Sequence, residues 1–378
     1  IPPGHCAYIG DRLNRDVEAA QKAGFARVVV RRYAQDFASH QSHHPDLIAD
    51  HYIDDLRELL PLFPALPEGE KSRPTFKASI STMWGRKNFA QLSDFLEAAP
   101  RLGFEQVELN HQIDSRMLAG LDLEKYPLSS IHEPCPADIS TDELKERDWL
   151  ISSPDEERRR RGVESIRHSV DLAGQLGLPV IVVHSGMVSN NLEPEKSLRQ
   201  LFEAGKTDSE EYRSIKQGLM DTRRRLIGPC LAAVRKSLLE LLEYAGRFNL
   251  RLGLENRYHY FDIPSLDEME ELLSLAGPER LGFVYDVGHA QALDRLGFYP
   301  HEEWLRRFST RMIEVHLHDV QGVSDHLAPG LGEIDFDMVA SYLPPHAIRT
   351  LELQPTNTAV QVRAGLDFLH KHGCIQSI

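Results

Sequence analysis

One stretch of the sequence places two potential metal ligands close together. Residues 280–290 (RLGFVYDVGHA) form an apolar run of strand length that ends in Asp286, and His289 follows one turn later. A buried strand that ends in a carboxylate, followed by an imidazole in the next turn, supplies two ligands from one strand-to-helix junction. The pair therefore predicts a metal site at the carboxyl end of this strand.

Other apolar runs end in the same kinds of residue. A single such residue is explained better by a buried polar group that a neighbour satisfies, but the repeated pattern favours a metal site. The residues that end these runs are Glu108, His132, His184, Glu255, Asp286, His316 and Glu352. Carboxylate and imidazole ligands without thiolates suit zinc, manganese, magnesium or cobalt, and the ligand types do not choose among these ions.

Short apolar runs alternate with longer amphipathic ones from residue 76 onward. Strands are predicted at 76–81, 105–109, 128–132, 179–184, 250–255, 281–286, 312–318 and 348–353. Helices are predicted at 88–101, 114–124, 155–176, 209–247 (with a break at Gly228-Pro229), 265–276, 301–308, 335–342 and 357–372. Eight strand–helix units predict an α/β fold of the (β/α)8 TIM barrel type, with its chemistry at the carboxyl ends of the strands. A doubly wound open sheet is the competing fold, but no Gly-x-Gly-x-x-Gly follows the first strand.

These motifs resemble those of the xylose isomerase-like superfamily. This superfamily includes sugar and sugar-phosphate isomerases and epimerases and the AP endonuclease family 2. The resemblance covers roughly residues 75–372. The motifs that carry it are residues 254–257 (LENR), 285–290 (YDVGHA), 315–319 (VHLHD), and Asp325-His326 with 330–336 (GLGEIDF).

The resemblance implies a mononuclear metal site and an acid–base pair. In the epimerases one divalent ion is held by a Glu, an Asp, a His and a second Glu, which here match Glu255, Asp286, His316 and Glu352. The two glutamates would remove a proton on one face of the substrate and return one on the other, by way of an enediolate. His289 would contact a substrate hydroxyl. The family's His-x-x-Asp favours His316 over His318 as the ligand, which leaves His318 beside the site.

The nuclease branch of the superfamily implies an alternative. Endonuclease-four-type AP endonucleases use three zinc ions, and their additional histidines match His132 and His184. Their Asp-x-His pair is approximated by Asp325-His326, which are adjacent here, and His289 is a further candidate ligand. A multinuclear zinc phosphodiesterase is therefore the alternative function, and a barrel with a decayed site and a scaffold role is a third.

Two residues of these motifs are candidates for holding the substrate. Arg257 comes two residues after Glu255 and is a candidate for binding a substrate phosphate or carboxylate. His184 is a candidate for contacting the substrate as well as a metal ion.

The first sixty residues carry a separate motif. Residues 10–16 (GDRLNRD) resemble the fourth motif of haloacid-dehalogenase (HAD)-type phosphatases, whose first acid binds magnesium and matches Asp11, with Asp16 as a second acid. The resemblance covers residues 1–62 and is to the C-terminal end of such a domain, without its Asp-x-Asp nucleophile motif. We therefore expect a small α/β fragment without phosphatase activity of its own.

The expected elements of this fragment are short. They are a buried strand at 6–11, a helix at 14–23, a strand at 27–30, and a strand and helix within 46–60. A proline-rich linker at 63–74 would join the fragment to the barrel at 75–378.

Composition and charge narrow the expected partners. The net charge of −14 disfavours binding to duplex DNA, so a small-molecule carbohydrate is the expected partner.

No apolar run approaches the ~18 residues that a membrane span needs. The four cysteines are far apart in the sequence and predict reduced thiols in a cytoplasmic protein. The stretch 185–228 is too long for an ordinary loop and predicts either a lid or a contact in a homo-oligomer.

Overall fold

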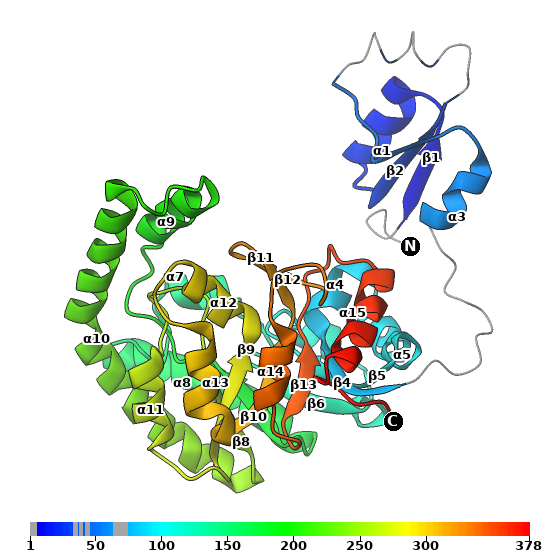
Figure 1. Cartoon of the computed structure of the whole chain (residues 1–378). Helices are drawn as coiled ribbons and strands as arrows, with labels where there is room; N and C mark the ends of the chain where they lie inside the picture. Colours follow the sequence, from blue (N-terminus) through cyan, green and yellow to red (C-terminus); the bar gives the residue numbers. More distant parts are fainter. Residues whose placement is uncertain (1–5, 33–36, 38–40, 42–45, 63–74) are drawn as a thin grey trace. The chain divides into compact units, whose positions relative to one another are not determined.

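The computed structural model describes residues 6–32, 37, 41, 46–62 and 75–378 (Figure 1). Contacts divide the chain into two compact units, residues 1–73 with 87–94, and residues 74–86 with 95–378. The predicted linker at 63–74 lies outside the described residues. The two units are described separately.

The N-terminal unit contains a three-stranded parallel sheet. Its strands are β1 (Ala7–Gly10), β2 (Arg27–Arg31) and β3 (His51–Ile53), with β2 in the middle. A π-helical turn (Leu13–Val17) leads into α1 (Glu18–Lys22), and a 3-10 turn (Leu56–Glu58) leads into α3 (Leu59–Leu62). Leu13, Val17, Ala20, Val28, Val30 and Ala49 form the core.

The prediction of a buried first strand is wrong. Ile9 in β1 is 46% exposed, and the other residues of β1 are exposed or half-buried. Among the described residues β1 pairs only with β2, so it forms an edge of the sheet.

The second unit is a closed barrel of eight parallel strands, which confirms the predicted fold. The strands are β4 (Phe76–Ser81), β5 (Phe104–Leu109), β6 (Leu128–His132), β7 (Val180–Val183), β8 (Arg251–Glu255), β9 (Leu281–Asp286), β10 (Met312–Leu317) and β13 (Ile348–Leu351). They are short, apolar and buried, as strands covered on both faces must be. Val180, Val182, Val284 and Ile313 form a core cluster, and Gly253 and Gly282 leave room for Val284 and Ile313.

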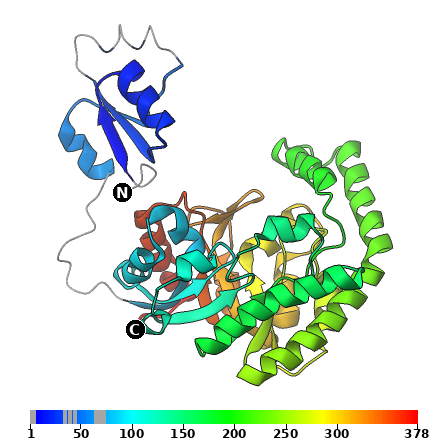
Figure 2. The same cartoon turned by 180° about the vertical axis from the view of Figure 1, so that it is seen from behind.

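Helices surround the barrel (Figures 1 and 2). They are α4 (Thr82–Asn88), α5 (Leu92–Leu102), α6 (Ser115–Leu118), α7 (Thr141–Glu146), α8 (Glu156–Gln175), α9 (Glu193–Glu203), α10 (Glu210–Ala245), α11 (Leu266–Leu273), α12 (Val287–Arg295), α13 (His301–Phe308), α14 (Phe336–Tyr342) and α15 (Ala359–Lys371). Within the part of the chain that the structure describes, no helix is both long and apolar enough to span a membrane.

Several helix predictions differ from the structure. The helix predicted at 88–101 corresponds to α5, and α4 before it was not predicted. The helix predicted at 114–124 is instead the short α6 and a separate 3-10 turn, Leu123–Lys125. The predicted break at Gly228-Pro229 is wrong, because α10 continues through Pro229. Along its length α10 packs against α8 and α9, and such tertiary packing stabilises a helix that contains a proline.

The stretch 185–228, predicted as a lid or an oligomer contact, forms α9 and the first half of α10. These two helices (green in Figures 1 and 2) stand out from the side of the barrel. A hairpin of β11 (Asp319–Gln321) and β12 (Ser324–Leu327) follows β10 and was not predicted, because its sequence is polar and short. Gly322 turns this hairpin with a φ of 63°.

Candidate metal centre

Four side chains predicted as metal ligands come together at the carboxyl ends of the barrel strands. Glu255 and Asp286 are the last residues of β8 and β9, His316 lies near the end of β10, and Glu352 follows β13 directly. All four are buried, with exposures of 0, 0, 0 and 1%. One ligand atom from each lies within 4.8 Å of the others. Ligand atoms around a common ion at ~2.0–2.2 Å are separated by distances of this order.

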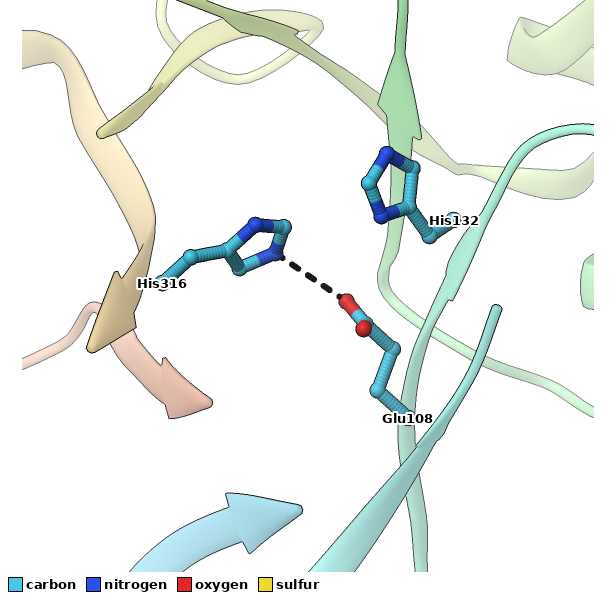
Figure 3. Close-up of side chains that lie close together, drawn as sticks. All are labelled: Glu108, His132 and His316. Carbon is cyan, nitrogen blue, oxygen red and sulfur yellow. Dashed lines mark hydrogen bonds and ion pairs between the residues drawn. The ribbon is translucent and has the colours of Figure 1, made fainter. Parts of the chain in front are cut away.

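His316 Nδ1 is the atom around which the carboxylates gather. It lies 3.1 Å from Glu255 Oε1, 3.2 Å from Glu352 Oε2 and 3.7 Å from Asp286 Oδ2. The other ring nitrogen, Nε2, lies 3.2 Å from Glu108 Oε2 on β5 (Figure 3). If Nε2–H donates to Glu108, the lone pair of Nδ1 points to the carboxylates, which is the tautomer that a ligand needs.

Glu108 also belongs to a second group with His132 and His316 (Figure 3). A neutral imidazole offers only one lone pair, so His316 cannot serve both groups at once. The group with three carboxylates provides more negative charge for a cation. We therefore assign Glu108 as the hydrogen-bond partner that orients His316.

From Glu314 onward, alternate side chains of β10 and of the residue after it face the barrel interior. Glu314 Oε1 accepts hydrogen bonds from Ser130 Oγ at 2.8 Å and Thr350 Oγ1 at 2.6 Å. Two residues further on is His316, and two residues beyond that His318 Nε2 lies 3.0 Å from Asp286 Oδ1. His318 thus contacts one of the predicted ligands, and the choice of His316 over His318 stays a prediction.

The electrostatics of the cluster favour a cation. Burial by itself would raise the pKa of Glu352, but His316 and other histidines outweigh it and lower this pKa well below the usual range. Burial would lower the pKa of His316, but Glu352 and Glu108 raise it well above the usual range. Glu352 Oε1 is buried and makes no hydrogen bond within the described residues. A buried excess of carboxylates with an oxygen that accepts no hydrogen bond is a donor set that suits a divalent ion.

His132 and His184 extend the centre on one side. Their Nε2 atoms are 2.6 Å apart, and His184 Nε2 lies 3.3 Å from Glu255 Oε2. His132 Nδ1 lies 3.4 Å from Glu352 Oε1. The structure therefore brings both predicted additional ligands to the two glutamates. His111, which sequence reasoning missed, packs its ring 5.1 Å from that of His132.

His289, Asp325 and His326 extend it on another side. His289 Nδ1–H donates to the backbone oxygen of Asn256 at 3.0 Å, so its Nε2 faces the site, 3.9 Å from Asp325 Oδ2. His326 Nε2 lies 3.5 Å from Glu352 Oε2, and its ring stacks on that of His318 at 4.2 Å. Asp325 and His326 are adjacent in the sequence, without the intervening residue of the Asp-x-His pair. Both side chains still reach the site, because His326 adopts a φ of 61° at the end of the hairpin.

Arg257, predicted to bind a substrate anion, lies against the cluster. Its Nη1 donates to Glu255 Oε2, and its Nε is 3.9 Å from Asp262 Oδ2. A cavity of about 510 Å³, a volume that includes its open mouth, adjoins Arg257 and His184. The cavity thus reaches two residues that contact Glu255, although none of the four predicted ligands lines it.

Asn256 is a further residue that sequence reasoning did not assign. Its side chain donates to the backbone oxygen of Asp286 at 2.8 Å and accepts from the backbone nitrogen of Asp286 at 2.9 Å. This double hydrogen bond fixes the end of β9 against the end of β8. Glu108, by contrast, carried a usable signal, because it ends an apolar run in the same way as the assigned ligands.

The acids of the N-terminal unit form no comparable group. Asp16 Oδ2 accepts from the backbone nitrogens of Asp11 at 2.8 Å and Arg12 at 2.9 Å, and Asp16 Oδ1 accepts from Arg15 Nε at 2.9 Å. Hydrogen bonds from Arg15 and from the backbone lower the pKa of Asp16. Asp11 pairs with Arg15 at 2.8 Å. None of the candidate ligand groups found among the described residues lies in this unit.

Comparisons with known proteins agree with this description. Residues 96–372 match the family of xylose isomerase-like TIM barrels. Residues 1–59, at the N-terminal end of the chain, match the HAD-hydrolase-like family. The matched regions correspond to the barrel and to the small parallel sheet.

Two curated relatives match parts of the chain. An uncharacterized protein of Methanocaldococcus jannaschii is 26% identical over 188 residues, which is 49% of this chain and 53% of that protein. An inosose dehydratase of Geobacillus kaustophilus is 32% identical over 89 residues, which is 23% of this chain and 28% of that enzyme. The chain therefore matches about half the length of the first relative and about a quarter of the second.

Solved structures share the barrel fold. A D-tagatose 3-epimerase-like protein has a TM-score of 0.55 at 19% identity, covering 78% of this chain and 96% of its own. D-psicose 3-epimerase from Clostridium cellulolyticum has a TM-score of 0.54 at 12% identity, covering 78% and 99%. The IolI protein with a bound zinc atom has a TM-score of 0.52 at 13% identity, covering 78% and 95%. At these identities the likeness establishes the fold alone.

Proposed function

Because the chain belongs to the xylose isomerase-like TIM barrel family, we propose that it is a divalent-metal-dependent isomerase or epimerase. Its substrate would be a sugar, a sugar phosphate or a related polyol. The observation that carries the proposal is the position of the two glutamates. Glu255 and Glu352 come from strands separated by β9 and β10, yet both lie within 3.2 Å of His316 Nδ1.

Four side chains would hold the ion, namely Glu255, Asp286, His316 and Glu352. A bound divalent ion would polarise the carbonyl and hydroxyl oxygens of a substrate and so acidify the neighbouring C–H. Which ion binds is left open by the ligand types, which suit zinc, manganese, magnesium and cobalt.

The residues of the chain would carry out the proton transfers. One of Glu255 and Glu352 removes the proton next to the substrate carbonyl, which gives an enediolate, and the other returns a proton to the opposite face. His289, whose Nε2 faces the site, would accept a hydrogen bond from a substrate hydroxyl. Burial lowers the pKa of His289 to about 4, so its ring is neutral near pH 7 and can accept that bond.

Isotope exchange tests the proposal directly. Metal-loaded protein is incubated in D₂O with a panel of ketoses, inososes and their phosphates, and deuterium at the carbon next to the carbonyl is followed by NMR. We expect exchange that depends on Glu255 and Glu352, and an unchanged rate for the control Glu124→Gln, which alters an exposed glutamate. The absence of exchange with every substrate, in protein shown to hold metal, would overturn the proposal. Mass spectrometry separates epimerisation from loss of water, the reaction of the dehydratase relative.

A multinuclear zinc phosphodiesterase is the second candidate. It is supported by the approach of His132 and His184 to the two glutamates, which goes beyond what one metal ion needs. Metal analysis separates the candidates, because a phosphodiesterase of this type requires at least two tightly held ions per chain. One ion per chain, with no hydrolysis of a phosphodiester such as bis(p-nitrophenyl) phosphate, argues against it. A chain that holds no ion in excess zinc or manganese would favour a scaffold role.

A further inference from the structure

The cavity beside the metal centre contains a lysine that the proposed chemistry does not use. The cavity is bounded on the metal side by His184 and Arg257 and on the outer side by α7 and α8. Both residues contact Glu255, with His184 Nε2 3.3 Å from Glu255 Oε2, so the cavity lies one side chain away from the proposed metal ligands. Lys145, on α7, lines the outer side.

Lys145 is a cation without a carboxylate partner. It forms no ion pair with a residue that the structure describes, although other basic residues nearby do, such as Arg147 with Glu143 and Arg158 with Asp148. Its side chain lines the same cavity as that of Arg257.

Arg257 provides a second cation, and part of its guanidinium donates no hydrogen bond to the described residues. Its Nη1 is used by Glu255, but its Nη2 makes no hydrogen bond within the described part of the chain. A guanidinium that is fixed by one carboxylate can still present its other edge to a phosphate or carboxylate.

Each of the two acids of the cavity accepts one backbone hydrogen bond. The Glu133 carboxylate accepts the backbone N–H of His184 at 2.9 Å, and Asp262 accepts the backbone N–H of His259 at 3.3 Å. Much of the remaining lining is apolar, including Leu144, Trp149 and Met187. An apolar wall strengthens the attraction between a cation and an anion that enters.

We propose that this cavity binds an anionic group of the substrate, a phosphate or a carboxylate, between Lys145 and Arg257. The inference rests on the proposed function, because it takes the ligand to be the substrate of the neighbouring metal centre. The anionic group then lies at the end of the substrate away from the carbon that reacts between the two glutamates. Lys145 thereby selects acidic sugars over neutral ones.

Binding measurements test the site without turnover. Metal-loaded full-length protein is titrated calorimetrically with inorganic phosphate and, separately, with acetate, so that the two anion types are distinguished. Lys145→Ala is the test variant, because Lys145 is half-buried and contacts no metal ligand. Lys125→Ala is the control, since Lys125 is exposed and pairs with Asp122. We expect Lys145→Ala to weaken binding of the preferred anion about tenfold, and Lys145→Arg to restore most of it.

Steady-state kinetics of the same variant provide the second test. For a phosphorylated or carboxylated substrate, Lys145→Ala should raise KM about tenfold with little change in kcat, whereas KM for a neutral sugar should not change. Equal anion binding by wild type and Lys145→Ala, or no anion binding by either, overturns the inference while exchange on neutral sugars still supports the proposed function. Lys145-dependent anion binding in a protein that exchanges no sugar proton supports the site and overturns the proposed function.

Discussion

Two regions of this molecule have acidic residues after parallel strands, and the hydrogen bonding of these acids differs between the two regions. In the N-terminal unit the oxygens of Asp16 are taken up by two backbone N–H groups and by Arg15. In the barrel Glu352 Oε1 makes no hydrogen bond within the described residues, with His132 Nδ1 3.4 Å away, and Glu352 shares a buried space with two other carboxylates. The first acid is held by hydrogen bonds of its own loop, whereas the second belongs to a buried group of carboxylates that lacks enough donors for all its oxygens.

The strongest test of this difference is to replace one acid in each region by its neutral amide and to compare the effects on the rate. Glu352→Gln keeps the shape of the side chain but removes the carboxylate that we propose as a base and a metal ligand, so we expect proton exchange to fall by at least ~1,000-fold. Asp11→Asn in the N-terminal unit should leave the rate unchanged. The rates are compared by NMR in D₂O at saturating metal. A similar loss in both variants would contradict the assignment of chemistry to the barrel alone.

The second prediction concerns the residue that orients His316. Glu108→Gln retains a hydrogen-bond acceptor but no charge, and we expect metal affinity to fall ~10–100-fold, as for other partners of metal-bound histidines. Affinity is measured by competition with a chelator. Glu105→Gln is the matched control, because Glu105 lies on the same strand with its side chain exposed. Unchanged affinity in Glu108→Gln would remove Glu108 from the centre.

The third prediction separates the two regions by pH. Burial lowers the pKa of His301 in the barrel to about 4, and its ring lies between Tyr285 and Gln291. In the unfolded chain the His301 ring is protonated below pH ~6.5, whereas in the folded barrel it stays neutral down to pH ~4. The barrel therefore loses stability as the pH falls from about 6.5 toward 4, by about 2 kcal/mol at pH 5. The pKa of Asp16 is lowered instead, so its contribution is present above pH ~4 and is lost only below it.

Urea unfolding at pH 7 and pH 5 measures the loss in the barrel. His301→Gln should reduce the difference between the two pH values. An unaltered difference in this variant would show that other groups cause it.

The smallest expected effect is at Asp16. Asp16→Asn keeps one acceptor oxygen but loses the charge that attracts Arg15, so we expect the N-terminal unit to lose about 1 kcal/mol. Hydrogen exchange of the Asp11 and Arg12 amides reports this loss locally. Asp11→Asn is the control, because the Asp11 side chain is 40% exposed. Equal protection in Asp16→Asn and wild type would mean that these hydrogen bonds do not hold the loop.

Much of the barrel could be predicted from the sequence, because a buried parallel strand has a continuous run of apolar residues. The ends of these runs led to Glu255, Asp286, His316 and Glu352, which the structure brings together. Partnerships across the barrel could not be predicted in this way, because Glu108 and His316 are 208 positions apart and meet only when the sheet closes.

Other differences also arise from tertiary packing. Pro229 predicts a helix break, but neighbouring helices keep α10 intact. An apolar strand such as β1 predicts burial, but its place at the edge of the described sheet leaves Ile9 exposed. His111 lies in the loop after β5, where no periodic pattern indicates the direction of its side chain.

The alternation of Glu314 and His316 on β10, and of His318 just after it, limits how this protein can vary in length. Inserting or deleting one residue between Glu314 and His316 would turn His316 and His318 away from the face that they share with Glu314, since alternate residues point in opposite directions. The nearby turn at Gly322 carries no such alternating set, so natural or engineered length changes should be accepted there and rejected within the strand.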